Sequence, residues 1–285
     1  MLKERTLTTL VTLPLLIAAV WFDSQIHSFT VLIALWGVLA VSEFYGMVVS
    51  AKVPPLTLFG IVWTLLFILS GDGAISSFLE TRFGAGQVPV FLLISAAILP
   101  LTWLLRNAQN REAVNRWTWT LAGIVYIGVL LSLLLAVRGA SDGRNWVFFI
   151  FLTTIASDSA AFLIGRKWGR RKLAPAISPA KTWEGAIAGV FGAIIISLVF
   201  VPAAFGSVSN PLFLPVLSYL SAMSLALAAS IFGQLGDLVE SLIKRNMNAK
   251  DSGRVFPGHG GALDRLDSVV FAGVVVYYYV VWLTR

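Results

Sequence analysis

The sequence predicts an all-α, polytopic membrane protein with about nine transmembrane helices and a cytoplasmic N-terminus. Of its 285 residues, 58% are hydrophobic and 12% are charged, whereas a soluble domain carries about 25% charged residues. Apolar runs near the roughly 20 residues that one membrane crossing needs recur along the chain. Lys and Arg gather in alternate loops between these runs, which is the pattern of the positive-inside rule.

The apolar runs define the predicted spans in order. They are residues 6–22, 28–50, 53–70, 88–105, 117–137, 146–165, 183–203, 212–243 and 266–284. The first run follows Lys3 and Arg5, as in a signal peptide, but a second apolar run begins at once and no small-residue cleavage site lies near Val20. We therefore expect a retained first span. The eighth run exceeds one crossing, so its C-terminal turns are expected to protrude into water.

The orientation follows from the basic residues. The N-terminus and every second loop carry most of them, and the opposite side carries only Arg82, Arg138, Arg144 and Arg285. This asymmetry places the 166–182 and 244–265 loops in the cytoplasm. The net charge of +7 suits anionic lipid headgroups. Nucleic acid is not an expected partner, because the basic residues sit in short loops.

Composition also limits the chemistry. The chain has no cysteine, which excludes disulfides, thiolate nucleophiles and Cys-held metals. Two histidines argue against a histidine-built metal site. A metal here would be held by carboxylate oxygens, which favour hard ions such as Mg²⁺.

Acidic residues divide the chain into two predicted regions. Half of the 14 acids fall between residues 158 and 267. We therefore expect residues 1–140 to form a lipid-facing scaffold and residues 141–285 to carry the functional site.

Asp158 is an acid within a predicted span, about 18 Å past Trp146 along its helix. At that depth it is expected to lie inside the hydrocarbon core of the membrane, where an isolated carboxylate costs roughly 2.5–3.5 kcal/mol. It either pairs with a cation for packing or lines a polar cavity; Glu43, inside the second span, is similarly unusual and its role is open.

Two clusters of polar residues follow in the last two spans. Asp237, Ser241 and Lys244 recur at helical spacing and share one face. Glu240 precedes Lys244 by four residues, which fits a helix pair at a solvated end as well as a site. Asp264 and Asp267 are expected to open the ninth helix, where they either suit the helix dipole or serve the site.

The connecting loops add cations and glycines. Residues 256–261 form a glycine-rich turn that could bind an anion through backbone N–H groups, with His259 as a phosphate donor or a loop-ordering residue. No Walker-type motif exists, so a P-loop is excluded. In the 166–185 loop, the basic run 166–172 fits membrane topology, and Lys181 is the better site candidate. Ser178-Pro179 predicts a turn, and Thr182 predicts a helix cap.

These motifs resemble a known family. The stretch from Ser241 to Asp267, including Lys250-Asp251, His259-Gly260-Gly261 and Asp264-Arg265, is similar to the C-terminal pattern of CDP-diacylglycerol synthase, also called phosphatidate cytidylyltransferase. The segments 178–185 and 158–166 resemble the same family. The resemblance covers about residues 150–275, and it departs from the usual pattern at Ala161 and Ala262, neither of which removes a polar group.

The resemblance implies a nucleotidyltransferase of phospholipid biosynthesis in a bacterial-type inner membrane. CTP, phosphatidate and membrane lipids would be its partners, Mg²⁺ its cofactor with a second cation left open, and a homodimer one open form of assembly. Carried over, the metal ligands would be Asp237 and Asp264, and these two with Lys244 and Asp267 would be catalytic. The implied substrate-binding residues are Asp158, Ser178, Lys181, Thr182, Glu184, Ser241, Arg245, Lys250, Asp251, His259, Gly260, Gly261 and Arg265.

The chemistry fits the residue types independently. A phosphate monoester carries about −1.5 to −2 charges at neutral pH, so the attacking oxygen needs no general base. Carboxylate-held metals and Lys or Arg would offset the repulsion between the two anions. Two alternatives stay open: a cation-coupled transporter, suggested by Asp158 and Glu43, and a lipid kinase that uses CTP as phosphoryl donor.

Overall fold

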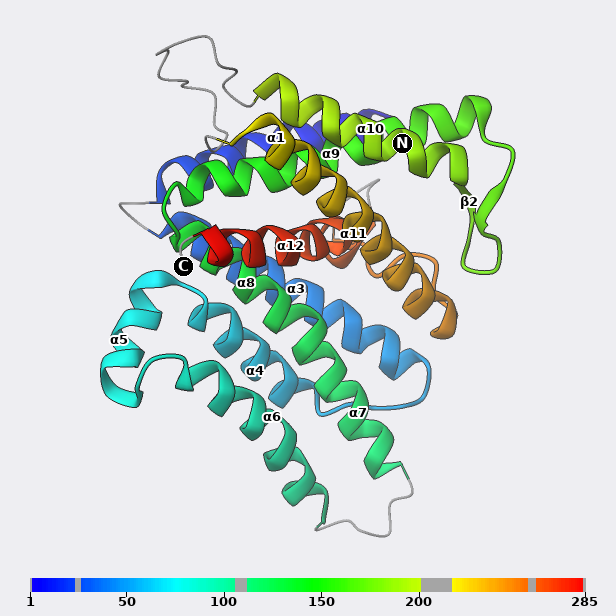
Figure 1. Ribbon diagram of the computed structural model, residues 1–285. Coiled ribbons are helices and arrows are strands. Elements are labelled where there is room, and N and C mark those ends of the chain that lie inside the picture. Colours follow the sequence, from blue (N-terminus) through cyan, green and yellow to red (C-terminus); the bar gives the residue numbers. More distant parts are fainter. Residues whose placement is uncertain (1, 24–26, 106–111, 201–216, 256–259, 284–285) are drawn as a thin grey trace. The chain divides into compact units, whose positions relative to one another are not determined.

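The computed structural model describes residues 2–23, 27–105, 112–200, 217–255 and 260–283. Within these ranges the chain is mostly helical, as predicted, and its strands form one small two-stranded sheet (Figure 1). The helices are α1 (Leu2–Trp21), α3 (Ser28–Ser50), α4 (Thr57–Ser70), α5 (Gly73–Phe83), α6 (Gln87–Leu105), α7 (Ala113–Gly123), α8 (Leu130–Gly139), α9 (Gly143–Trp168), α10 (Trp183–Phe200), α11 (Tyr219–Asn246) and α12 (Asp267–Leu283). A π-helical segment, η1 (Ile124–Val129), joins α7 to α8.

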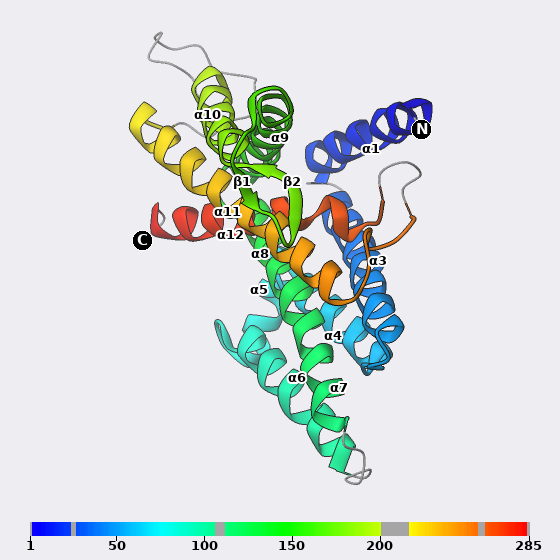
Figure 2. The same cartoon turned by 90° about the vertical axis from the view of Figure 1, so that its right-hand side faces the viewer.

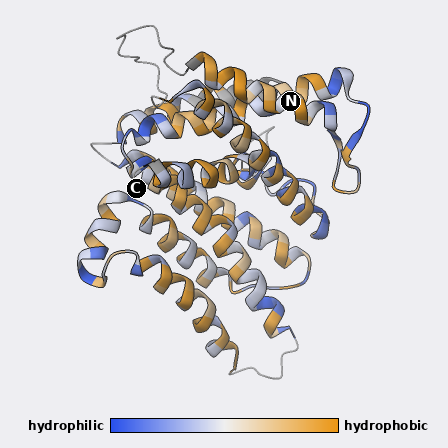
Figure 3. Cartoon of the chain, viewed as in Figure 1, coloured by the Kyte–Doolittle hydropathy of each residue, from blue (hydrophilic) through white to orange (hydrophobic). Residues whose placement is uncertain are grey.

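Each predicted apolar run overlaps a helix. Among the described residues, five helices are long and apolar enough to cross a membrane, or six if the bent pair α4–α5 forms one crossing. The chain is therefore a helical membrane protein. Hydrophilic residues gather in the β1–β2 hairpin and near helix ends, whereas the helix shafts are largely hydrophobic (Figure 3). Helix α5 and the hairpin, β1 (Lys172–Ala174) with β2 (Ser178–Thr182), were not predicted.

The chain divides into two compact units. Unit 1 comprises residues 1–139 and 246–265, and unit 2 comprises residues 140–245 and 266–285. The segment 246–265, which carries most of the predicted C-terminal motif, thus packs with the N-terminal helices. Each unit is described separately below.

In unit 1, helices α4 and α7 approach α3 through Tyr45. The hydroxyl of this buried side chain donates a hydrogen bond of 2.7 Å to the backbone oxygen of Thr120. A Cβ atom at Gly60 or Gly123 would lie 2.2 Å or 2.6 Å from Tyr45 atoms. Glycine at both positions is therefore what allows the close approach, and a larger residue would separate these helices.

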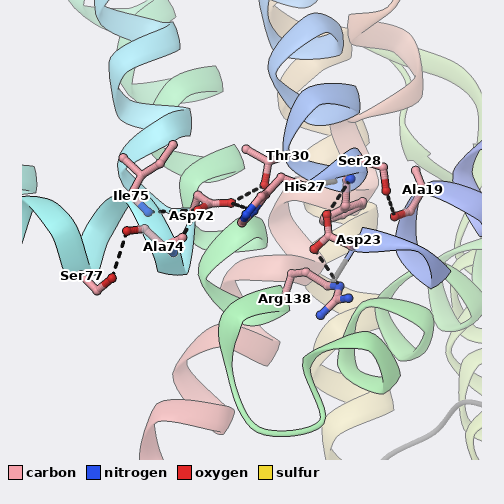
Figure 4. A network of polar contacts seen from close by, with 11 residues as sticks. Ala19, Asp23, His27, Ser28, Thr30, Asp72, Ala74, Ile75, Ser77 and Arg138 are labelled. Atoms are coloured by element: carbon pink, nitrogen blue, oxygen red, sulfur yellow. Dashed lines mark hydrogen bonds and ion pairs between the residues drawn. The ribbon is translucent and has the colours of Figure 1, made fainter. Parts of the chain in front are cut away.

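A polar network connects α3, α5 and α8 in the same unit (Figure 4). Asp72 caps α5 by accepting bonds from Ala74 and Ile75, and its other oxygen accepts a bond from Thr30 and contacts His27. Arg138 at the end of α8 pairs with Asp23 at 3.4 Å. The cap explains why the chain turns by 95° between α4 and α5 and then resumes as a helix.

In unit 2, small residues bring α9 and α10 together. A Cβ at Gly192 would lie 2.7 Å from the Ala160 Cβ, so glycine is required for this contact. The hydroxyl groups of Ser157 in α9 and Ser230 in α11 are 2.7 Å apart. Such small-residue contacts and hydrogen bonds between helices are the usual means of helix association in membranes. These contacts hold α9, α10 and α11 together, and the three helices carry predicted site residues such as Asp158, Glu184 and Asp237.

Candidate functional site

The β1–β2 hairpin joins α9 to α10 (Figure 2), and its second strand, β2, contains Lys181. Thr182 precedes α10, and its hydroxyl oxygen accepts a bond of 3.2 Å from the Gly185 N–H. This confirms the predicted helix cap. A Cβ at Gly165 or Gly169 would lie within 3.0 Å of the Thr182 side chain, so the end of α9 closes tightly on the cap. The cap and this close packing therefore fix the backbone at the base of the hairpin, next to Lys181.

The turn predicted at Ser178-Pro179 is wrong, because both residues lie in β2. The strands pair with Lys172 opposite Thr182 and Ala174 opposite Ser178, so residues 175–177 make the turn. Proline is tolerated there because a two-stranded hairpin consists of edge strands. Glu184 accepts backbone bonds from Arg170 and Arg171 at 3.1–3.2 Å, and thus fastens the start of the hairpin to α10.

Helix α11 supplies the polar face that the sequence predicted. The Ser241 hydroxyl lies 3.5 Å from an Asp237 oxygen, at the long limit of a hydrogen bond. Lys244 Nζ lies 2.6 Å from Glu240 Oε2, so the predicted pair is confirmed. The side chains of Glu240 and Lys244 are only 1% and 12% exposed, however, which rules out a solvated helix end.

Three carboxyl groups of unit 2 meet beside this face. Oxygen atoms of Asp237, Glu240 and Asp267 all lie within 4.8 Å of one another. The start of α12 can approach α11 because Gly236 has no side chain: a Cβ there would lie 2.3 Å from the Asp267 carbonyl oxygen. The charges of Asp237 and Asp158 both act on Asp267, so Asp158 belongs to the same surroundings. We call Asp237, Glu240 and Asp267 the acid cluster.

Two lysines balance the acid cluster. Lys181 Nζ lies 2.6 Å from Asp237 Oδ2, and Lys244 lies beside Glu240. Carboxylate oxygens are the ligands that Mg²⁺ and similar hard cations prefer, and their mutual spacing suits one ion after small movements. The donor set therefore fits a divalent cation.

Glu240 is a member of the acid cluster that the predicted site omitted. Its spacing of three residues from Asp237 was the available signal, since i and i+3 share a helix face. Asp267, by contrast, was predicted and is the first residue of α12, where its Oδ1 accepts a bond from the Ser268 N–H. Asp264 lies in a separate 3₁₀ turn (Leu263–Arg265), so the prediction that Asp264 and Asp267 open one helix is wrong.

In unit 1, the loop before α12 surrounds the Asp264 carboxylate. Its Oδ2 accepts bonds from the backbone N–H groups of Gly261, at 2.7 Å, and Ser252, at 3.1 Å. Gly260 has φ +85°, a conformation that glycine adopts without strain, and a Cβ there would lie 2.5 Å from the same oxygen. Gly260 thus leaves room for the Asp264 carboxylate, and the N–H groups of Gly261 and Ser252 fix its orientation.

The remaining predicted residues lie in several places. Arg245 donates a bond of 3.3 Å to the backbone oxygen of Ile177 in the hairpin. Asp158, Lys250, Asp251 and Arg265 are exposed, and Ser178 is half-buried in β2. His259 lies outside the described residues. The structure thus groups Asp158, Lys181, Asp237, Ser241, Lys244 and Asp267 in unit 2, and Gly260, Gly261 and Asp264 in unit 1.

Replacement of Glu240 by Gln is expected to destabilise the protein by about 1–3 kcal/mol, because Lys244 loses its nearest counter-ion and keeps only the more distant acids of the cluster. The measurement is the thermal unfolding midpoint in detergent. The double variant Glu240→Gln/Lys244→Met should recover most of the loss, since it removes the uncompensated charge. An unchanged midpoint in Glu240→Gln would show that the pair carries no such energy.

The sequence matches known proteins over nearly its whole length. A model described as the cytidylyltransferase family matches residues 3–283. A Bacillus subtilis (strain 168) protein named phosphatidate cytidylyltransferase is 34% identical over 251 residues, covering 88% of this chain and 87% of that relative. A Staphylococcus haemolyticus protein of the same name is 31% identical over 274 residues, covering 95% of both chains. A Brucella suis biovar 1 protein, also of that name, is 38% identical over 200 residues, which cover 67% of this chain and 68% of that relative.

These matches agree with the motif resemblance. The family model includes both units, so the relationship is not limited to the C-terminal motif. This chain belongs to the cytidylyltransferase family.

Proposed function

We propose that this enzyme converts phosphatidate and CTP to CDP-diacylglycerol and pyrophosphate. The name shared by its relatives supports the reaction. The observation that carries the proposal in this chain is the acid cluster with Lys181 and Lys244 in a helical membrane protein. An oxygen of the phosphatidate phosphate attacks the α-phosphorus of CTP. A new P–O–P link forms, the bond between the α-phosphate and the β-phosphate breaks, and pyrophosphate leaves with the bond electrons.

The residues of the site would bind and orient these anions. The attacking phosphate is already ionised at neutral pH, so no side chain has to remove a proton. Lys181 and Lys244 would offset the charge of the triphosphate and of the leaving pyrophosphate. A Mg²⁺ ion held by carboxylates, with a second cation left open, would supply further neutralisation of the reacting oxygens. We propose Asp237 and Asp264 as metal ligands, and Asp267 and Lys244 as the other members of the catalytic set.

The other predicted residues would recognise the substrates. Gly261 donates its backbone N–H to Asp264, Gly260 lies against the same carboxylate, and His259 immediately precedes Gly260 in the sequence. Further polar and charged residues would contact the phosphates or the cytidine. The catalytic region would be residues 141–285, which include the loop that precedes α12. These substrate-binding residues are Asp158, Ser178, Thr182, Glu184, Ser241, Arg245, Lys250, Asp251 and Arg265.

Nine spans in a bacterial inner membrane would put the N-terminus and the site on the cytoplasmic side, and the absence of cysteine makes this directly testable. Ala176→Cys lies in the hairpin turn, and Ser141→Cys lies just before α9. In intact cells, a membrane-impermeant maleimide is expected to label Ser141→Cys alone, and Ala176→Cys only after permeabilisation. Labelling of Ala176→Cys from outside would contradict the orientation.

The reaction itself is tested with purified protein, phosphatidate vesicles and each nucleoside triphosphate in turn, with Mg²⁺ or a chelator. Label in the α-phosphate of CTP should enter the lipid, and pyrophosphate should appear in equal amount. Transfer of the γ-phosphate label would identify a lipid kinase instead. Cation flux into vesicles without any lipid product would identify a transporter.

A further inference from the structure

Glu43 in α3 holds the loop that carries Asp264. Its Oε2 accepts bonds from the Ser252 hydroxyl, at 2.9 Å, and from the Leu263 N–H, at 3.1 Å. These partners lie more than 200 residues further along the chain but in the same unit. The loop therefore bonds to the carboxyl group of a membrane-spanning helix from two sides.

Glycine allows this loop to close around Glu43. A Cβ at Gly253 would lie 2.1 Å from Glu43 Oε1, and a Cβ at Gly261 would lie 2.3 Å from Oε2. The carboxyl group thus occupies the space that two side chains would otherwise fill. Trp36, seven residues earlier on the same face of α3, adds a bond of 3.0 Å from its indole N–H to the Ala262 oxygen.

The same loop residues also position Asp264. Ser252 offers its hydroxyl to Glu43 and its backbone N–H to Asp264 Oδ2. Gly261, which lies against Glu43, donates the second bond to Asp264, and Leu263 is the neighbour of Asp264 in the chain. A displacement of the loop from Glu43 would consequently move both donors that orient the Asp264 carboxylate.

An acidic residue within a spanning helix is costly, about 2.5–3.5 kcal/mol on insertion scales. Polar anchoring of a loop could be achieved from a helix end at lower cost. Glu43 accepts hydrogen bonds from the loop that flanks Asp264, so the acid supports a segment of the proposed site in addition to packing α3.

We infer that Glu43 is a positioning residue that sets the orientation of Asp264, and thereby the affinity of the site for its divalent cation. This inference rests on the proposed role of Asp264 as a metal ligand. Residues that support metal ligands typically alter metal affinity by about 10- to 100-fold when replaced. The N-terminal region would then contribute to the site and not only to the scaffold.

The test compares Glu43→Ala, Glu43→Gln and Ser252→Ala with the control Ser42→Ala, whose hydroxyl bonds only within α3, to Val38. Two quantities are measured: the Mg²⁺ concentration for half-maximal activity, and Mn²⁺ binding by electron paramagnetic resonance without substrates. Glu43→Ala is expected to raise the Mg²⁺ requirement and weaken Mn²⁺ binding by about tenfold or more, with a smaller loss of activity at saturating metal. Glu43→Gln keeps an acceptor oxygen and should stay within about threefold of the unchanged protein, because neutral hydrogen bonds are only modestly weaker.

Coupling between residues provides a second readout that a general loss of stability would not give. Ser252→Ala is the milder change, because Glu43 and its bond from the Leu263 N–H are retained, and it should weaken metal binding in the same direction. The double variant Glu43→Ala/Ser252→Ala should be no worse than Glu43→Ala alone, because the shared bond is already lost. Glu43→Ala combined with Ser42→Ala should be additive.

Two results would overturn the inference. One is unchanged metal dependence in both Glu43→Ala and Ser252→Ala; the other is a Glu43→Gln defect equal to that of Glu43→Ala, which would assign Glu43 a direct charge effect. The proposed function fails separately: if no nucleotide is incorporated into lipid but Mn²⁺ binding follows the expected order of variants, the inference stands without that reaction.

Discussion

Asp237→Asn is expected to reduce CDP-diacylglycerol formation by about 10²- to 10³-fold, as the loss of one preorganised electrostatic group typically does. The substitution keeps the size of the side chain and its contact with Ser241. It removes the charge that faces Lys181 and takes one anionic oxygen donor from the acid cluster. The measurement is the rate of lipid labelling at saturating CTP and Mg²⁺, together with the amount of protein inserted in the membrane.

Asp142→Asn is the matched control for this variant. Asp142 is an exposed acid of the same unit, and its side chain makes no capping bond to α9. Its φ of 55° is also readily adopted by Asn, so the backbone should not change. Full activity in Asp142→Asn with loss in Asp237→Asn locates the effect in the acid cluster. Turnover near that of the unchanged protein in Asp237→Asn would remove the basis of the metal assignment.

Lys181→Met is expected to raise the Michaelis constant for CTP by about 10- to 100-fold, which corresponds to a charge-assisted bond of roughly 1.5–3 kcal/mol. Its ammonium group lies 2.6 Å from Asp237 and therefore competes with a cation for that carboxylate. Binding of Mn²⁺ without CTP should consequently hold or become tighter. Weaker CTP binding without weaker Mn²⁺ binding distinguishes a phosphate-binding lysine from one that only stabilises the fold.

The conservative variant Lys181→Arg checks the same account. It keeps the positive charge, so it should recover part of the CTP affinity, although the guanidinium group is larger and planar. Both variants are compared at equal protein amount in detergent. A Lys181→Met protein that binds Mn²⁺ and CTP with equally weakened affinity would mean that Lys181 supports the acid cluster and does not meet the nucleotide.

Local patterns predicted the helical part of the fold well. The predicted run 28–50 matches α3 at both ends, and the other runs overlap their helices. A membrane span must satisfy its backbone hydrogen bonds internally, so an apolar composition is enough to predict a helix there. The Thr182 cap and the Glu240–Lys244 pair are likewise local, separated by three and four residues. Acidic residues stand out in so apolar a chain, and Asp237 and Asp267 entered the predicted site through the resemblance of their motifs to a known family.

Long-range contacts were out of reach of this reasoning. Nothing near Glu43 in the sequence indicates Ser252 or Leu263, and nothing near Asp23 indicates Arg138. The burial of Glu240 depends on how α12 approaches Gly236, which helical periodicity does not specify. The hairpin was missed because its strands are short and lie between two strongly apolar helices, and α5 because its Asp72 cap follows a run that reads as a completed span.

The most direct test of the metal assignment is anomalous diffraction from crystals of the protein grown with Mn²⁺ in place of Mg²⁺. The account predicts an anomalous peak at direct coordination distance, about 2.0–2.2 Å by analogy with Mg²⁺, from a carboxylate oxygen of Asp237. Asp264 should likewise lie at coordination distance from a bound ion. A peak that avoids both carboxylates, with Lys181 still paired to Asp237 in active protein, would contradict it.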